Sequence, residues 1–302
     1  MLTLEDIFSP QTFEQFTAES FTKAPALLEG KRERFSHLLT PTQLIEIITS
    51  RPLPSNHIGL SLNGQSIPIE SFCRQSPNTD TVIADLPRLT EALEAGATLF
   101  VAHFETLHQD LWDCCALLSE AFQVQVTVNA YFGGPGSRGF APHIDHHDVL
   151  VAQAWGSKSW MIGDPTTEAP LVLPDHMSEP AGELTRSLEL RSGDLLYLPR
   201  GYWHAAKGNE SEGTLHLSFG IQPSTGIHFL GWLRRELLNE RAFRLELPRF
   251  EDSSVLREHL RTLSHELGEV LNEAMLTKYL ESHQVRIRAE RAQRAEELWP
   301  PR

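Results

Sequence analysis

The sequence is poor in cysteine and in basic residues. Only three cysteines, Cys73, Cys114 and Cys115, occur in 302 residues. Two of them are adjacent, which makes a disulfide between them awkward, and no Cys-x-x-Cys pair occurs, so we expect reduced thiols in a cytosolic compartment. Lysine and arginine number 26 against 40 aspartates and glutamates, a formal net charge of −14. This charge argues against binding nucleic acid or anionic membranes and favours a basic macromolecular partner.

Long apolar runs and internal repeats are also missing. No run approaches the roughly 20 apolar residues that a membrane-spanning helix needs, so no membrane span is predicted. The first residues, Met-Leu-Thr-Leu-Glu-Asp, lack the basic and apolar regions of a secretion signal, and none is expected. A hydrophobic fraction of 40% is ordinary for a globular protein. The length suffices for one large domain with a smaller appendage.

Periodicity and composition divide the chain into two parts. The first third mixes short strands with helical patterns, among them a helix that begins at Thr40-Pro41 and ends before Arg51. From Val124 the period changes to two, and strands are predicted over 143–155, 159–163, 186–190, 195–198 and 214–221. Short strands between Gly and Pro turns are typical of an all-β sandwich or barrel. After Pro223 the sequence predicts helices over 228–247 and 253–283, so we expect domains at residues 1–225 and 226–302.

The segment Arg138-Gly-Phe-Ala-Pro-His143-Ile-Asp145-His146-His147-Asp148 carries the first chemical signal. A Gly-rich loop precedes it, and an apolar run, a Gly-Ser turn and Lys158 follow. In an extended strand, residues i and i+2 point to the same face. His143 and Asp145 are therefore placed to share one metal ion.

A second His-x-Asp pair, His146 and Asp148, overlaps the first, and spacing alone rejects neither. Parity separates them, because His143 and Asp145 share a strand face with His147 whereas His146 and Asp148 point the other way. Either pair leaves the metal one protein ligand short of the usual three.

The segment Gly193-Asp-Leu-Leu-Tyr-Leu-Pro199-Arg-Gly201-Tyr-Trp-His204 offers that third ligand. Pro-Arg-Gly predicts a tight turn, after which the next strand begins with two aromatic residues and His204. Two imidazoles and one carboxylate form the facial triad of non-haem Fe(II) oxygenases, which leaves three metal positions open.

Together these segments resemble a known family. Gly193…Pro199-x-Gly201-x-x-His204 is similar to the second cupin motif, and the run from Asn129 to Trp160 resembles the Jumonji-C-type cupins of the ribosomal oxygenase group. So do Leu93-Glu-Ala-Gly96 and Phe104-Glu-Thr-Leu upstream. The resemblance implies a mainly β double-stranded β-helix, the cupin jelly-roll barrel, with flanking N-terminal helices and a C-terminal helical region.

The resemblance also implies cofactors and residue roles. Fe(II) would be bound by His143, Asp145 and His204, with 2-oxoglutarate and O2 as cosubstrates. Lys158 would pair with the distal carboxylate of 2-oxoglutarate, as an anion in a dry pocket needs a cation. The remaining cosubstrate-binding positions are Tyr131, Asn129 and Ser218.

The C-terminal helices carry an apolar stripe. Its members, at spacings of four and three residues, are Leu256, Leu260, Leu263, Leu267, Val270 and Ala274. Packing against the chain's own barrel and homodimerisation both fit this pattern, and the resemblance favours a homodimer. The winged-helix module that follows these helices in ribosomal oxygenases is expected to be absent or reduced.

Two classes of function remain open at this point. The first is an Fe(II)- and 2-oxoglutarate-dependent hydroxylase acting on a side chain of a protein or peptide, a ribosomal protein among the candidates. Hydroxylation of a natural product or amino acid, and N-methyl demethylation, are alternatives with the same chemistry. The second class is a metal-binding cupin without catalytic activity.

Overall fold

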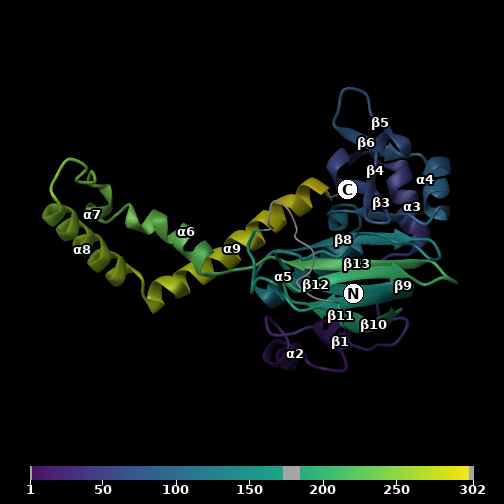
Figure 1. The fold of residues 1–302 in the computed structure, drawn as a ribbon, viewed down its shortest axis with the longest axis horizontal. Coiled ribbons are helices and arrows are strands. Elements are labelled where there is room, and N and C mark those ends of the chain that lie inside the picture. Colours follow the sequence, from purple (N-terminus) through teal and green to yellow (C-terminus); the bar gives the residue numbers. More distant parts are fainter. Residues whose placement is uncertain (1, 173–183, 299–302) are drawn as a thin grey trace. The chain divides into compact units, whose positions relative to one another are not determined.

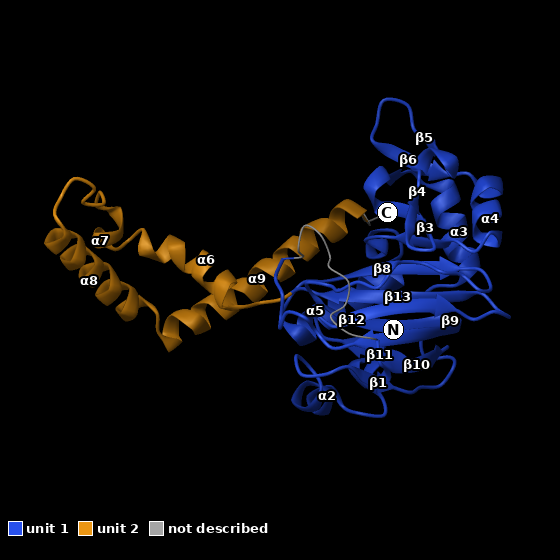
Figure 2. Ribbon diagram, in the orientation of Figure 1, with its two compact units in different colours: residues 1–222 blue, residues 223–302 orange. Residues whose placement is uncertain are grey.

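The computed structural model describes residues 2–172 and 184–298. The chain divides into two units, Met1–Gln222 and Pro223–Arg302, coloured separately in Figure 2. The division falls close to the expected boundary at 225/226, where the composition changes. Among the described residues, no helix is both long and apolar enough to cross a membrane.

Unit 1 is built on a ten-stranded sheet (Figure 1). Its main path runs in the order β1-β11-β9-β13-β8-β7-β3-β4, while β10 and β12 both pair with β9. The strands are β1 (Ala26–Leu28), β3 (Ile58–Leu62), β4 (Gln65–Ile67), β7 (Thr98–Val101), β8 (Val126–Gly133), β9 (Asp148–Gly163), β10 (Arg186–Arg191), β11 (Leu195–Leu198), β12 (Trp203–Gly208) and β13 (Thr214–Ile221). All of these pairings are antiparallel.

Strand β9 joins two layers of this sheet. Its first half pairs with β11 and β13, and its second half, from residue 157 onward, pairs with β10 and β12. The change of partners occurs at Gly156, whose φ is +66°. A Cβ atom there would lie 1.9 Å from the carbonyl oxygen of Gly213, so only glycine fits this corner. A strand that switches sheets in this way closes a jelly roll, and the predicted double-stranded β-helix is confirmed.

Helices and a small sheet flank the barrel. The helices of unit 1 are α1 (Leu4–Phe8), α2 (Phe13–Glu19), α3 (Pro41–Ser50), α4 (Leu86–Glu94) and α5 (Gln109–Phe122). The small sheet contains β2 (Leu53–Pro54), β5 (Cys73–Gln75) and β6 (Thr81–Ala84). Helix α3 begins as predicted, with the Thr40 hydroxyl accepting a hydrogen bond from the Gln43 amide and Pro41 at the first helical position. One core cluster joins helices to strands, with Phe8, Leu44 and Val128 among its members.

The strands predicted at 143–155 and 159–163 differ from the observed ones. The structure has one continuous strand, β9, in their place, and residues 143–147 precede it. His143 forms only an isolated bridge to His204. The alternation of side chains nevertheless persists, because Ile144 is 3% exposed whereas its neighbours His143 and Asp145 line a cavity.

Unit 2 is helical, as expected, with breaks that the sequence pattern did not predict. Its helices are α6 (Gly226–Leu237), α7 (Arg241–Arg244), α8 (Ser253–Val270) and α9 (Glu273–Leu298). The single helix expected over 253–283 is interrupted at Leu271, whose ψ of 77° is not helical. Ala274 therefore belongs to α9 and not to the helix that carries the rest of the apolar stripe. Phe229 and Leu233 of α6 pack on Tyr279 of α9.

Candidate metal centre

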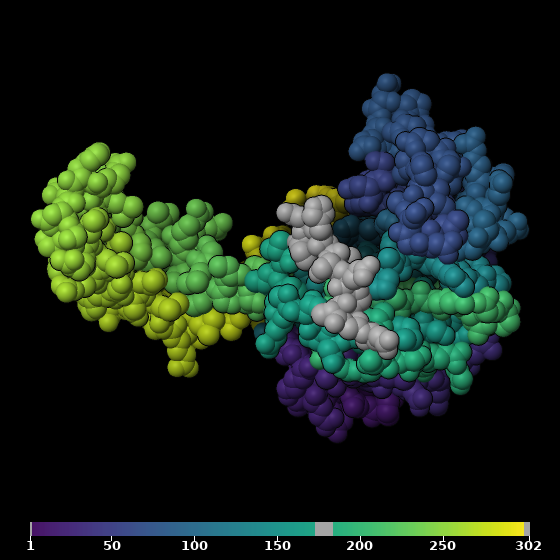
Figure 3. Space-filling view, in the orientation of Figure 1, coloured from purple at the N-terminus to yellow at the C-terminus, as the bar shows by residue number. Residues whose placement is uncertain are grey.

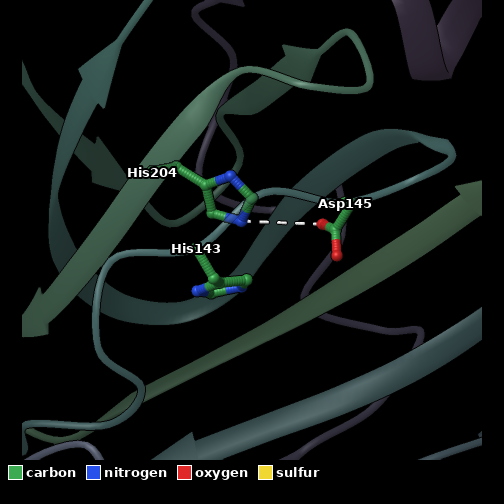
Figure 4. Close-up of side chains that lie close together, drawn as sticks. All are labelled: His143, Asp145 and His204. Atoms are coloured by element: carbon green, nitrogen blue, oxygen red, sulfur yellow. Dashed lines mark ion pairs between the residues drawn. The ribbon is translucent and has the colours of Figure 1, made fainter. Parts of the chain in front are cut away.

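Three side chains converge at one end of the barrel. One potential ligand atom from each of His143, Asp145 and His204 lies within 4.8 Å of the other two. Figure 4 shows the three side chains and marks the contact between His204 Nε2 and Asp145 Oδ2, two atoms that lie 3.6 Å apart. Three ligands on one face of an octahedron lie about 3 Å apart when each metal–ligand bond is roughly 2.0–2.2 Å. The three groups therefore have to move closer together to share one ion.

Main-chain hydrogen bonds bring the three residues together. The His143 amide donates to the His204 carbonyl at 3.0 Å, and the His204 amide donates to the His143 carbonyl at 2.9 Å. The Gly201 amide donates to the Asp145 carbonyl at 2.9 Å. Gly201, at a φ of +86°, makes the sharp turn between β11 and β12 that the Pro-Arg-Gly sequence predicts. Backbone pairing in place of a regular strand therefore sets the ligand positions.

The imidazoles present the correct nitrogen to a metal. His143 Nδ1 lies 2.8 Å from the Ala141 carbonyl oxygen, and His204 Nδ1 lies 3.0 Å from the Tyr202 carbonyl oxygen. A carbonyl oxygen only accepts, so each Nδ1 carries the proton and each Nε2 keeps its lone pair. Such hydrogen bonds fix the tautomer and ring orientation of metal-binding histidines. The donor set fits a divalent metal.

Electrostatics keep His204 in the ligating form. Burial, and then the neighbouring His143, lower its pKa to about 4, although Asp145 opposes the shift. The imidazole is consequently neutral at neutral pH, and only a neutral imidazole binds a metal ion. Nearby, burial first and Asp145 second raise the pKa of Tyr131 to about 12, which keeps the phenol protonated and able to donate a hydrogen bond.

The three residues open into a cavity of about 90 Å³. It is lined by all seven residues predicted for the site, which are Asn129, Tyr131, His143, Asp145, Lys158, His204 and Ser218. Lys158 lies deep, with 4% of its surface exposed. Within the described ranges its ammonium group has no carboxylate partner, and burial lowers its pKa to about 8. A buried cation without a counter-ion is costly, so this end of the cavity is suited to an anion.

The model of the JmjC domain family matches the chain over residues 99–229, a range that includes all seven of these residues. This segment is a JmjC domain. The predicted resemblance to the Jumonji-C cupins is therefore confirmed for residues 99–229.

Comparison with known proteins extends the similarity beyond the JmjC domain. The chain is 28% identical over 218 residues to the "Bifunctional lysine-specific demethylase and histidyl-hydroxylase NO66" of Drosophila persimilis, covering 72% of this chain and 31% of the relative. It is 35% identical over 129 residues to Ribosomal oxygenase 1 of Rattus norvegicus, covering 41% and 22%. The chain therefore spans less than a third of either relative. The solved structure of YcfD, a ribosomal oxygenase from Escherichia coli in complex with cobalt and 2-oxoglutarate, matches with a TM-score of 0.61 at 18% identity, over 91% of this chain and 71% of that one. At that identity the match shows the fold alone.

Two further residues of the JmjC cavity are not among the seven predicted for the site. Trp160 and His216 both line the cavity. Trp160 Nε1 and His216 Nδ1 are buried and have no hydrogen-bond partner in the described protein. Burial, followed by the charge of Lys158, holds the pKa of His216 well below its usual range. Trp160 lies two residues after Lys158, and His216 lies two residues before Ser218. Residues two apart in a strand share a face, so this spacing was the sequence signal that could have identified both.

The overlapping His146–Asp148 pair does not enter the JmjC cavity. Asp148 is 4% exposed, and its Oδ1 accepts a hydrogen bond from the Arg200 amide at 2.9 Å. His146 is absent from the cavity lining, whereas His147 and the partly exposed Phe140 form part of its wall. The geometry thus favours His143 and Asp145 as the metal-binding pair.

Proposed function

We propose that this chain is an Fe(II)- and 2-oxoglutarate-dependent oxygenase that hydroxylates a side chain of a protein or peptide. The observation that carries the proposal is the pairing of a His-Asp-His group with a buried, unpaired lysine in one cavity. A metal centre alone needs no cation nearby. A dicarboxylate that also binds the metal needs a positive group at its far end, and Lys158 supplies one.

The residues of the chain have separate tasks in this reaction. Iron with 2-oxoglutarate and O2 would supply the oxidation, in which one oxygen atom enters succinate and the other enters the product as a hydroxyl group, with loss of CO2. His143, Asp145 and His204 would hold the metal and leave three positions free. Lys158, with Tyr131, Asn129 and Ser218 around it, would orient the dicarboxylate. The apolar side chains of Val149, Val151 and Leu198 line the same cavity and restrict water.

A basic protein or peptide is the substrate class that the charge favours. The net charge of −14 attracts cationic segments and repels nucleic acid. The printed names of the relatives, histidyl-hydroxylase and ribosomal oxygenase, support a protein side chain as the target. The three cysteines are all buried and form no disulfide, which supports a reducing compartment such as the cytosol.

Succinate formation tests this proposal. Purified protein loaded with Fe(II) should convert 2-oxoglutarate to succinate, and a basic peptide substrate should gain 16 mass units, the mass of one oxygen atom. Loss of a methyl group from the peptide would instead identify a demethylase, and turnover of a free amino acid would identify a small-molecule hydroxylase. Metal binding without any binding of 2-oxoglutarate would contradict the oxygenase and leave a non-catalytic cupin.

The protonation of Lys158 predicts how cosubstrate binding depends on pH. Only the ammonium form pairs with a carboxylate, and burial lowers its pKa to about 8. Affinity for 2-oxoglutarate should therefore be constant below about pH 8 and fall about tenfold for each further pH unit. Calorimetric titration of metal-loaded protein between about pH 7 and 9.5 measures this. Lys158→Arg is the control, because a guanidinium stays charged throughout this range. A flat profile for the wild type would refute the role of Lys158.

We also propose that α8 mediates homodimerisation. No residue of α8 is buried, and Leu256 and Leu260 are 47% and 62% exposed. Two copies of this helix would shield their leucines from water, which favours a dimer by about 25 cal/mol per Å² of apolar surface buried. Sedimentation at micromolar concentration should show a dimer, and Leu256→Glu with Leu260→Glu should dissociate it. His265→Glu, on the opposite face of α8, is the control and should leave it intact. A monomeric wild type would exclude the dimer.

A further inference from the structure

The two segments that carry the metal ligands separate from each other just before they reach the metal. Strands β9 and β11 end their regular pairing at Val149 opposite Leu198. The next paired residues are His143 and His204, which form an isolated bridge. Between these two points the backbone offers one hydrogen bond, from the Gly201 amide to the Asp145 carbonyl. Asp145 and the turn at 199–201 thus lie in a gap in the ladder.

Asp148 fills this gap with a side chain. Its Oδ1 accepts a hydrogen bond from the Arg200 amide at 2.9 Å, so a carboxylate takes the place that a main-chain carbonyl would occupy in a regular ladder. The contact joins the start of β9 to the middle of the turn that precedes His204. Asp148 lies three residues after Asp145 in the sequence, and Arg200 lies four residues before His204.

Asp148 is itself held firmly. Its side chain is 4% exposed, and its carboxylate interacts with the buried hydroxyl group of Tyr197. The Tyr197 oxygen in turn accepts a hydrogen bond from the Thr22 amide at 2.8 Å. Tyr197 is completely buried. Tyr197 therefore contacts both the N-terminal segment, through the Thr22 amide, and Asp148, which accepts a hydrogen bond from the turn at Arg200.

We propose that Asp148 is a positioning residue of the metal centre, whose buried carboxylate fixes the 199–201 turn so that Asp145 and His204 stay at ligating distance. Asp148 touches neither the metal position nor the cavity, since it is absent from the cavity lining. It acts through the Arg200 amide and, one residue on, through the Gly201 amide that binds Asp145. Groups that orient metal ligands in this way typically contribute about 10- to 100-fold in metal affinity. The inference rests on the proposed metal centre.

Cobalt titration of four proteins tests this role. Co²⁺ affinity, the visible absorption spectrum of bound Co²⁺ and the melting temperature of the metal-free protein are measured for the wild type, Asp148→Ala, Asp148→Asn and Tyr197→Phe. Asp148→Ala should lose about 10- to 100-fold in Co²⁺ affinity and change the spectrum, because the turn moves and the ligand geometry changes. Asp148→Asn should recover most of the affinity, since the amide oxygen still accepts from Arg200.

Tyr197→Phe separates positioning from stability. It removes the buried hydroxyl group that accepts a hydrogen bond from the Thr22 amide and interacts with the Asp148 carboxylate, but it leaves the hydrogen bond from Arg200 to Asp148. It should therefore lower the melting temperature while changing Co²⁺ affinity by less than about threefold. Should Asp148→Ala not fold, Asp148→Ser replaces it, because a serine hydroxyl is polar but too short to reach the Arg200 amide. Equal affinity losses in Tyr197→Phe and Asp148→Ala, or wild-type affinity in Asp148→Ala, would overturn the role of Asp148 alone. A wild type that binds no Co²⁺ would overturn the metal centre and this role with it.

Discussion

Replacing His143, Asp145 or His204 with alanine is expected to abolish metal binding and turnover. Each change leaves two protein ligands, and the ligand atoms of the three residues already lie within 4.8 Å of one another, so no neighbour is needed to complete the set. Loss of one of three ligands should reduce metal affinity by several orders of magnitude, because two protein ligands bind a metal ion much more weakly than three. Titration of the purified variants with Fe(II) or Co²⁺, and succinate release, measure the two effects.

His146→Ala is the matched control for these variants. It removes an imidazole next to Asp145 in the sequence, but one that does not line the cavity. It should retain most of the metal affinity and most of the activity. The opposite pattern, with His146→Ala inactive and His143→Ala active, would show that the overlapping His-x-Asp pair binds the metal.

Lys158→Ala is expected to raise the concentration of 2-oxoglutarate needed for half-saturation by about 100-fold or more. Removing the ammonium leaves a carboxylate unpaired in a dry pocket, a loss on the order of 2–5 kcal/mol. Each 1.4 kcal/mol corresponds to about a factor of ten in affinity. Metal affinity should change little, since Lys158 is not among the three converging ligands. Titrations of the variant with metal and with 2-oxoglutarate separate the two quantities.

Lys158→Arg distinguishes loss of charge from loss of shape. The guanidinium keeps the positive charge but is larger and planar, so part of the affinity should remain. Unchanged 2-oxoglutarate affinity in Lys158→Ala would refute the assignment of Lys158. Absence of any 2-oxoglutarate binding by the wild type would refute the oxygenase as a whole.

The grouping of the candidate site residues in one cavity could be predicted from sequence because the chemistry that singles them out depends on residue type. A histidine and a carboxylate two residues apart, a distant Pro-x-Gly-x-x-His and a lysine after Gly-Ser are unusual in combination. The two histidines, the carboxylate and the lysine all line one cavity. The contributions of Trp160 and His216 were harder to predict. Trp160 and Lys158 are on the same face of β9, and His216 and Ser218 are on the same face of β13. The sequence does not show which of the two faces of each strand turns towards the cavity.

Element boundaries were predictable only where local sequence determines them. Thr40 and Pro41 determine where α3 begins. The Thr40 side chain caps the first turn, and the proline ring holds the backbone in a helical conformation, and both effects are local. Residues 143–147 were expected to be extended from the spacing of His143 and Asp145, yet their partner across the gap is a turn, and strand pairing depends on residues distant in sequence. The break at Leu271 likewise interrupts an unbroken apolar pattern. Periodicity records which side chains are apolar and does not record where the backbone bends.

The isolated bridge between His143 and His204 links metal binding to the folding equilibrium. The two imidazoles are far apart in the chain and meet only when the barrel has closed, so the unfolded ensemble offers no preformed site. An ion that binds the native state alone stabilises it by RT ln(1 + [M]/Kd), about 2.7 kcal/mol at a hundredfold excess over Kd. Adding a chelator should consequently lower the thermal midpoint of the wild type. It should leave that of His204→Ala unchanged, which makes the melting curve a readout of occupancy that requires no turnover.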